Sequence, residues 1–247
     1  MEKDLLGRGS NFSALFTVFA LVAFLFTTAS VASAGNPING AKVYQENCAT
    51  CHGDHGQGRG GPDGWFTGGG MAYGKSNISD AVGNKLNDQN FLAQTSDGFL
   101  KQTINEGRSN ERMPGGLVSG SDVDDVVAFI RNWQKVPSVP VMGDTVWGNA
   151  GHGKEIYLES CGECHGKNGE GIEGFSPALN DQKFLDAAND DWIRQTIQRG
   201  RSGSAMRPYE RGNPLANTEL EPREIDNVVS YIRTWDKNNK PLPGLNN

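Results

Sequence analysis

Two stretches of the chain carry a clear amphipathic pattern. Apolar residues recur at i, i+3, i+4, i+7 and i+10 along 123–133, and the same spacing returns along 225–235. This period places one apolar stripe on one face of an α-helix, so each stretch predicts a helix packed on a core. Ser121 suits the N-cap of the first helix, and Pro222 suits the first turn of the second. The stripes consist of Val123, Val126, Val127, Ile130 and Trp133, and of Ile225, Val228, Val229, Ile232 and Trp235.

Further helices are predicted upstream of each of these. Segments 97–106 and 191–199 predict middle helices, each followed by a glycine, Gly107 or Gly200, that suits a C-terminal cap. A first helix carries Tyr44 in one half and Tyr157 in the other, and it ends at a pair of cysteines. Long alternating apolar runs are not evident, so we expect an all-α fold with three helices in each half.

The same predicted elements are repeated along the chain. Residues 44–52 match 157–165 in register 113 positions apart, and 99–108 match 192–201 at 93 positions. The last helices match at 102 positions, so the loops differ in length while the order is kept. This is the signature of duplicated domains. We predict tandem helical domains at 35–136 and 151–247, joined by a linker, 137–150, with helix-breaking residues at Pro137, Pro140, Gly143 and Gly148.

The N-terminus predicts export. Lys3 and Arg8 precede an apolar run over 14–26, and Ala32 and Ala34 form a small-x-small site. We interpret residues 1–34 as a signal peptide; an uncleaved membrane anchor over 12–34 is the alternative. Either places the rest of the chain in the periplasm or on the extracytoplasmic face of the membrane. The net charge of −6, without a run of Lys or Arg, argues against nucleic acid as a partner.

All four cysteines fall in two Cys-x-x-Cys-His motifs, and these carry the predicted chemistry. In an exported chain this spacing indicates c-type haem attachment, because two thiols on one helical turn reach the vinyl groups of one porphyrin. The following histidine then binds the iron. A thiol–disulfide pair would not explain the repeated histidine, and zinc needs four local ligands. The residues are Cys48, Cys51 and His52, and Cys161, Cys164 and His165.

Met113 and Met206 are the methionines that align between the halves, and each lies beside a proline in an irregular segment. A thioether opposite histidine gives a six-coordinate iron, so both are predicted axial ligands, although core filling is the ordinary role of methionine. Met71 is an alternative in the first half, and Met142 lies in the linker. His55 and His152 have no counterparts and are interpreted as solvated loop residues.

Two further pairs are candidates for supporting roles. Carbonyls at Pro62 and Pro177, or at a neighbour of either, are expected to accept the Nδ1–H of the haem histidines. Arg108 and Arg201 match between the halves and are candidates for pairing with haem propionates; surface ion pairing is the alternative.

On these residues the chain resembles class I cytochrome c, twice over. The resemblance rests on Gly40, Tyr44, the first Cys-x-x-Cys-His, Met113-Pro114 and Trp133, and on Gly153, Tyr157, the second motif, Met206 and Trp235. It implies two covalently bound haems c, with iron held by His52 and Met113 and by His165 and Met206. It also implies that the first and last helices of each domain cross, with Tyr44 and Tyr157 against the last helix.

The arrangement is similar to dihaem periplasmic cytochromes and to dihaem cytochrome subunits of respiratory complexes. We therefore expect an electron carrier of the respiratory chain rather than an enzyme. Its expected donor is a quinol-oxidising complex or a dehydrogenase, and its expected acceptor is a terminal oxidase or another cytochrome. The alternatives are a dihaem peroxidase or sulfur-compound oxidase, and a fixed, anchored subunit of an oxidase or quinol-oxidising complex.

Two insertions depart from the repeat. Between haem histidine and methionine the first half is 20 residues longer, around 60–85, with Trp65 and Phe66. Between methionine and last helix the second half is nine residues longer and includes Tyr209 and Arg211. The sequence assigns neither insertion a role.

Overall fold

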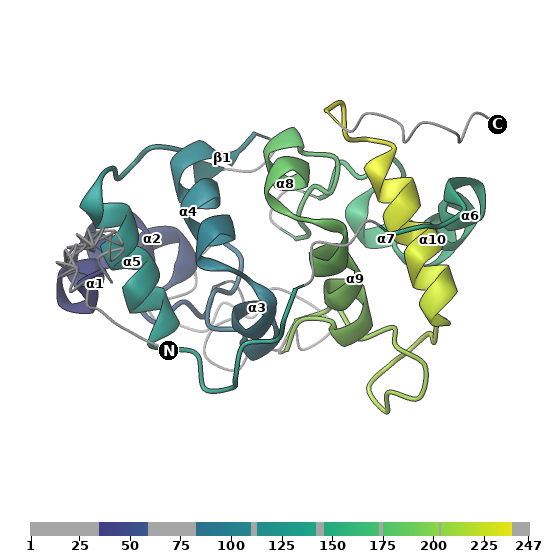
Figure 1. Ribbon diagram of the computed structural model, residues 1–247, viewed down its shortest axis with the longest axis horizontal. Helices are drawn as coiled ribbons and strands as arrows, with labels where there is room; N and C mark the ends of the chain where they lie inside the picture. The colour runs from purple at the N-terminus through teal and green to yellow at the C-terminus, as the bar shows by residue number, and fades with distance from the viewer. Residues whose placement is uncertain are drawn as a thin grey trace, which may run out of the picture. The chain divides into compact units, whose positions relative to one another are not determined.

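A computed structural model describes residues 35–58, 83–109, 113–141, 146–172, 175–202 and 204–238 (Figure 1). The signal-peptide prediction for 1–34, and the positions of Met71, Met142, Pro62, Trp65 and Phe66, lie outside the described residues. None of the helices within these ranges combines the length and the apolarity needed to cross a bilayer.

Among its described residues, the first half contains five helices and a hairpin whose two strands have two residues each. In chain order these are α1 (Pro37–Asn47), α2 (Ala49–His52), α3 (Gln89–Gln94), α4 (Asp97–Glu106), β1 (Gly107–Arg108), β2 (Met113–Pro114) and α5 (Ser121–Arg131). The second half repeats the helices as α6 (Ala150–Ser160), α7 (Gly162–His165), α8 (Gln182–Ala187), α9 (Asp190–Arg199) and α10 (Pro222–Arg233). The all-α, two-domain prediction is confirmed.

The first and last helices of each half cross closely, because a glycine lies at each crossing. A Cβ atom on Gly40 of α1 would lie 1.9 Å from the Asp125 carbonyl oxygen of α5, and one on Gly153 of α6 equally close to the Asn227 carbonyl oxygen of α10. Only glycine admits so short a separation between two helix backbones. The crossing buries the apolar stripes predicted from the sequence, and Val126 and Val228 are fully buried.

Buried tyrosines fix the end of each first helix against the last helix. Tyr44 packs edge-on against Trp133, with ring centroids 5.2 Å apart, and Tyr157 meets Trp235 at 5.3 Å. Both tyrosines have no exposed surface. The expected contact between Tyr44 or Tyr157 and the last helices is therefore confirmed.

The structure corrects the predicted elements in three places. Short helices α3 and α8 precede the middle helices, each capped by an aspartate: the Phe91 amide donates to Asp88 at 2.6 Å, and the Phe184 amide to Asp181 at 2.9 Å. They are too short to show a helical period in the sequence. Gly120, not Ser121, is the N-cap of α5, and the β1–β2 hairpin was not expected. The middle helix over 97–106 and the glycine caps after it and after α9 are confirmed.

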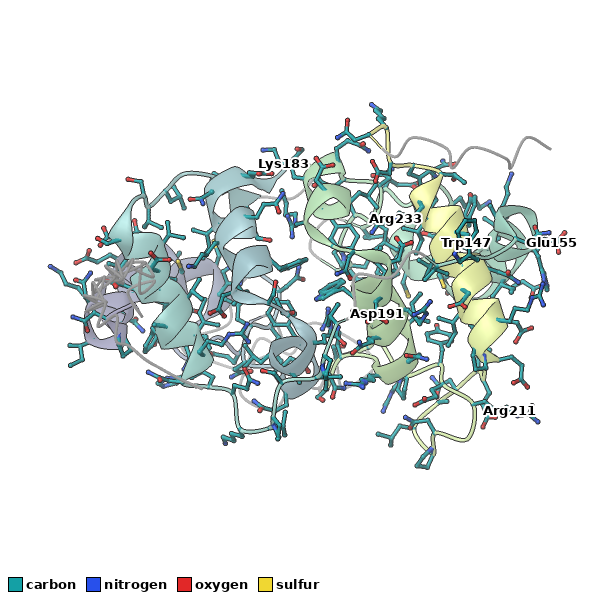
Figure 2. All side chains as sticks on the ribbon, in the orientation of Figure 1. Trp147, Glu155, Lys183, Asp191, Arg211 and Arg233 are labelled. Carbon is teal, nitrogen blue, oxygen red and sulfur yellow. The ribbon has the colours of Figure 1, made fainter. Side chains whose placement is uncertain are left out.

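A half-buried arginine near the end of each last helix fastens the corner between the short and middle helices. Arg233 of α10 donates to the carbonyls of Leu185 and Ala188 and pairs with Asp190 (Figure 2). Arg131 of α5 makes the equivalent contacts in the first half, with Leu92, Thr95 and Asp97. Each guanidinium supplies donors to carbonyls at a helix end that the helix itself leaves unpaired.

The two halves pack through equivalent aromatic residues. Within the unit formed by residues 34–247, α4 lies against α8 and α3 against α9 (Figure 1). Phe99 of α4 stacks on its counterpart Trp192 of α9, with centroids 4.8 Å apart and planes inclined by 17°. We call the surface built by α3, α4 and β1 against α8, α9 and the segment 200–202 the domain interface. Matched residues face each other across it, so the halves are related by an approximate twofold axis.

Polar contacts at the domain interface follow the same symmetry. The side-chain amide of Asn90 donates to the Arg199 carbonyl at 3.0 Å. Its counterpart in the second half, the Lys183 ammonium group, donates to the Glu106 carbonyl (Figure 2). The Ser109 amide donates to the Asp181 carboxylate at 2.7 Å. Each half thus supplies donors to the C-terminal end of the other half's middle helix.

Candidate functional site

Each Cys-x-x-Cys-His motif forms one helical turn directly after the first helix. In the first half the Cys48 amide donates to the Tyr44 carbonyl at 2.8 Å, and the His52 amide donates to the Cys48 carbonyl at 2.9 Å. The corresponding distances at Cys161 and His165 are 2.8 and 2.9 Å. The backbone therefore holds the two sulfurs and the imidazole of each motif within one helical turn, at positions i, i+3 and i+4.

A buried tyrosine hydroxyl closes each turn. Tyr44 donates to the Gly53 carbonyl at 2.8 Å, and Tyr157 donates to the Gly166 carbonyl at 2.8 Å. Gly53 and Gly166 have φ of 77° and 79°, which ends the helix and turns the chain away immediately after the histidine. The sequence placed both tyrosines next to the motifs but did not predict this hydrogen bond.

Both histidine rings are oriented by a backbone carbonyl. The Nδ1 atom of His165 lies 3.0 Å from the Pro177 carbonyl oxygen, as predicted. The Nδ1 atom of His52 lies 2.8 Å from the Asn84 carbonyl oxygen, so the expectation for Pro62 is wrong. Because a carbonyl oxygen can only accept, Nδ1 carries the proton in both rings and Nε2 keeps its lone pair.

A signal for Asn84 was present in the sequence. Residues 86–89 read Leu-Asn-Asp-Gln, and so do residues 179–182, 93 positions later. Extending this match backwards pairs Asn84 with Pro177. The carbonyl of the main chain makes the contact in both cases, so the side chains there are free to differ.

Burial favours the neutral imidazole that iron requires. Desolvation lowers the pKa of His52 and of His165 below the ordinary value, against smaller opposing effects of the carbonyl hydrogen bonds. A neutral ring with Nδ1 protonated presents Nε2 as a metal ligand.

The first cysteine of each motif has a raised pKa. Burial, and then the neighbouring thiol of each motif, raises the pKa of Cys48 to about 11 and that of Cys161 to about 12. Redox-active Cys-x-x-Cys pairs instead have a lowered pKa, because the thiolate is the reactive form. The environment of these thiols therefore disfavours the thiol–disulfide alternative and suits sulfurs held in thioether bonds.

The structure places both predicted methionine ligands after the middle helix and next to an arginine. Met113 in β2 pairs with Arg108 in β1, and the Arg201 amide donates to the Met206 carbonyl at 2.9 Å. Met206 is half-buried against the core of the second half. The assignment of Met113 and Met206 as axial ligands stays a prediction. His55 and His152 are exposed; His55 lies in a loop, as predicted, whereas His152 lies in the first turn of α6.

A buried arginine at the domain interface has an unused donor. The Arg201 Cζ atom lies 5.0 Å from the Phe91 ring centroid and 4.9 Å from that of Trp192. Desolvation lowers its pKa to about 10, partly offset by the Asp88 carboxylate. Its Nη2 donates to the Thr196 hydroxyl at 3.3 Å, whereas its buried Nη1 has no hydrogen-bond acceptor among the described residues. Such a donor suits an anionic oxygen, as on a haem propionate.

Arg108 has the equivalent surroundings in the first half. Its Cζ atom lies 5.5 Å from the Phe99 centroid and 5.7 Å from that of Phe184, across the domain interface. Its Nη2 donates to the Thr103 hydroxyl at 2.7 Å. The residues present thus fit a c-type haem in each half: two thiols and an imidazole on one turn, and an arginine paired with the predicted methionine ligand.

Comparison with known proteins agrees with this geometry. The family model "Cytochrome c" matches residues 38–134 and 150–236. The chain therefore belongs to the cytochrome c family and contains two of its domains. It binds two haems c covalently.

Relatives of this chain include subunits of respiratory oxidases. The cbb3-type cytochrome c oxidase subunit FixP of Azorhizobium caulinodans is 29% identical over 79% of this chain and 58% of its own length. Subunit CcoP of Rhodobacter capsulatus is 26% identical over 79% of this chain and 61% of its own length. The chain thus spans about 60% of these relatives. A chain of a reducing HAO-like protein complex of Kuenenia stuttgartiensis aligns with a TM-score of 0.49 and 19% identity, over 83% of this chain and 98% of its own.

Proposed function

We propose that this chain carries single electrons between respiratory redox partners through two haems, one in each domain. The observation that carries the proposal is the repeated geometry of the motifs, in which each half-buried histidine has its Nδ1 atom hydrogen-bonded to a carbonyl and its Nε2 atom available. A haem iron with two protein ligands supplies one-electron chemistry by alternating between the ferrous and ferric states.

Different residues are proposed to hold each haem in different ways. Cys48 and Cys51 in domain 35–136, and Cys161 and Cys164 in domain 151–247, form the thioether bonds. His52 and His165 would each bind an iron. Met113 and Met206 would supply the second protein ligand and would leave no site for a substrate, which favours a carrier over a peroxidase or a sulfur-compound oxidase.

The domain interface gives the two sites a fixed relation. Arg108 and Arg201, each stacked between an aromatic ring of its own half and one of the other, are proposed to bind the propionates. Charged guanidinium groups there hold the acidic edges of both haems toward the domain interface. A short separation between the haems would let an electron cross inside the chain rather than through solution.

The partners follow from the relatives. FixP and CcoP are named as subunits of cbb3-type cytochrome c oxidases, so we propose a terminal oxidase of this kind as the electron acceptor. The proposed donor is a quinol-oxidising complex or a dehydrogenase, and another cytochrome is the alternative acceptor. The chain works on the extracytoplasmic side of the membrane. A permanent place as an oxidase subunit is the second candidate, favoured by the names of these relatives.

A redox titration followed by optical spectroscopy tests the carrier proposal. The exported protein is expected to contain two haems and two low-spin couples without a high-spin signal. A sample that contains no haem, or zinc in its place, would overturn the proposal. A five-coordinate haem would instead favour an enzyme. Co-purification with an oxidase, with Met1 or Glu2 intact at the N-terminus, would decide for the anchored subunit.

A further inference from the structure

The two halves differ where the second half has its nine additional residues. The segment from Arg207 to Glu221 leaves the methionine, forms a loop and returns to α10; Arg211 on this loop pairs with Glu221 (Figure 2). The Leu220 amide donates to the Tyr209 carbonyl at 2.8 Å, and the Tyr209 amide donates to the Ile197 carbonyl at 3.1 Å. The base of the loop is thus fixed to the end of α9, and Tyr209 lies at this base.

Tyr209 points from the loop to the second Cys-x-x-Cys-His motif. Its hydroxyl donates to the Ser160 carbonyl at 2.7 Å, one residue before Cys161. Its ring packs on the same core as Cys161 and Met206. Burial raises the pKa of Tyr209 to about 12, and the next causes are the nearby thiols of Cys161 and Cys164. One side chain therefore joins the methionine loop to the attachment turn.

The first half has no such side chain at this position. Met113-Pro114 is followed by Gly115 and Gly116, whereas Met206-Arg207-Pro208 is followed by Tyr209. Gly116 holds the position of Tyr209, because its amide donates to the Ile104 carbonyl at 3.2 Å as the Tyr209 amide donates to the Ile197 carbonyl. A tyrosine thus reaches the attachment turn of the second half, whereas a glycine without a side chain occupies the matched position in the first.

We infer that Tyr209 covers the thioether edge of the haem in the second domain and raises the potential of that haem alone. The inference rests on the proposed haem sites. An apolar ring over this edge excludes water, and exclusion of water disfavours the ferric state because that state carries one more positive charge. The hydrogen bond to Ser160 holds the ring in place, so Tyr209 is a positioning residue for the attached group.

Two substitutions in the full-length, haem-loaded protein separate the ring from the hydroxyl. Tyr209→Ala removes the cover, and Tyr209→Phe keeps the ring but removes the bond to Ser160. Tyr231→Phe, which deletes a hydroxyl from α10 in the same domain, is the matched control. The readout is the pair of midpoint potentials from a spectroelectrochemical titration. Cys161→Ser/Cys164→Ser, which removes the covalent attachment in the second domain, identifies the couple that belongs there.

Tyr209→Ala is expected to lower the potential of the second-domain couple and to leave the other unchanged. The expected size is about a tenfold shift in the distribution of the electron between the haems, or about 59 mV for a one-electron couple. Tyr209→Phe is expected to lower the same couple by less, and Tyr231→Phe to move neither. If Tyr209→Ala does not fold, the test is the midpoint potential of the second-domain couple in Tyr209→Phe compared with that in Tyr231→Phe.

Two intact haems with unmoved potentials in the Tyr209 variants would overturn this inference and leave the proposed function standing. Equal shifts of both midpoint potentials would also overturn it, because the substitution would then act on the whole protein rather than on one haem. A wild-type protein without haem would instead overturn the proposed function itself.

Discussion

The close crossing of α1 and α5 makes Gly40→Ala a sharp test of the fold. The added Cβ atom would lie 1.9 Å from the Asp125 carbonyl oxygen and 3.0 Å from the Phe129 Cβ atom. Ordinary contacts between such atoms are about 3.5 Å. The nearest obstacle is main chain in the middle of a helix, so no side-chain rotation relieves it, and the two helices must move apart by about 1 Å or more.

The expected loss follows from this separation. Forcing extra volume into a packed core costs about 1–3 kcal/mol and occasionally more. The gain in helix propensity from glycine to alanine returns about 1 kcal/mol at most. Gly98 in α4 is the matched control, because it is exposed and an added Cβ atom meets only the Ser96 hydroxyl, at 3.7 Å. Gly98→Ala is therefore expected to stabilise the chain by about 0.5–1 kcal/mol.

Thermal unfolding followed by circular dichroism measures the difference. At about 2–4 °C per kcal/mol for a chain of this size, a difference of about 0.5–4 kcal/mol means that the two variants are expected to melt roughly 1–16 °C apart, with Gly40→Ala lower. Gly153→Ala, at the equivalent crossing of α6 and α10, is expected to repeat the loss. The reasoning is refuted if Gly40→Ala melts at or above the wild type while Gly98→Ala behaves as expected.

Three further outcomes are expected. Cys161→Ser/Cys164→Ser halves the covalently bound haem seen after denaturing electrophoresis; full retention of two haems would contradict the attachment sites. Met206→His lowers the potential of one couple and removes the thioether-to-iron absorption that it contributes, whereas an unchanged spectrum excludes Met206 as a ligand. The free energy of unfolding falls as the pH rises above about 10, because tyrosines ionise there in the unfolded chain while burial keeps Tyr44 and Tyr157 protonated in the fold. Tyr44→Phe is expected to reduce that slope by up to about 1.4 kcal/mol per pH unit in denaturant titrations, and an unaltered slope would contradict the burial.

The sequence predicted most reliably what is encoded locally. The spacing Cys-x-x-Cys-His is contained in one turn, so the attachment residues could be predicted without knowledge of the fold. The apolar period of α5 and α10, and the glycines after α4 and α9, likewise depend on neighbours within a few residues. These features needed only the geometry of a helix.

Contacts between distant parts of the chain were harder to predict. The stacking of Phe99 on Trp192 joins two halves of the sequence, and no local period marks it. The carbonyl of Asn84 was missed because the prediction matched two prolines by residue type, whereas the register of the repeat pairs Asn84 with Pro177. Arg108 and Arg201 were chosen as candidates from the repeat alone, whereas their stacking between rings of both halves required coordinates.

The matched residues on both sides of the domain interface make each half complementary to a second copy of its own kind. A gene fragment encoding either half alone would therefore yield a protein with an uncovered aromatic face, and we expect such a protein to form homodimers. Fusion of two copies into one polypeptide makes this association independent of concentration. It also lets each side diverge separately, and the matched residues Phe99 and Trp192 already differ.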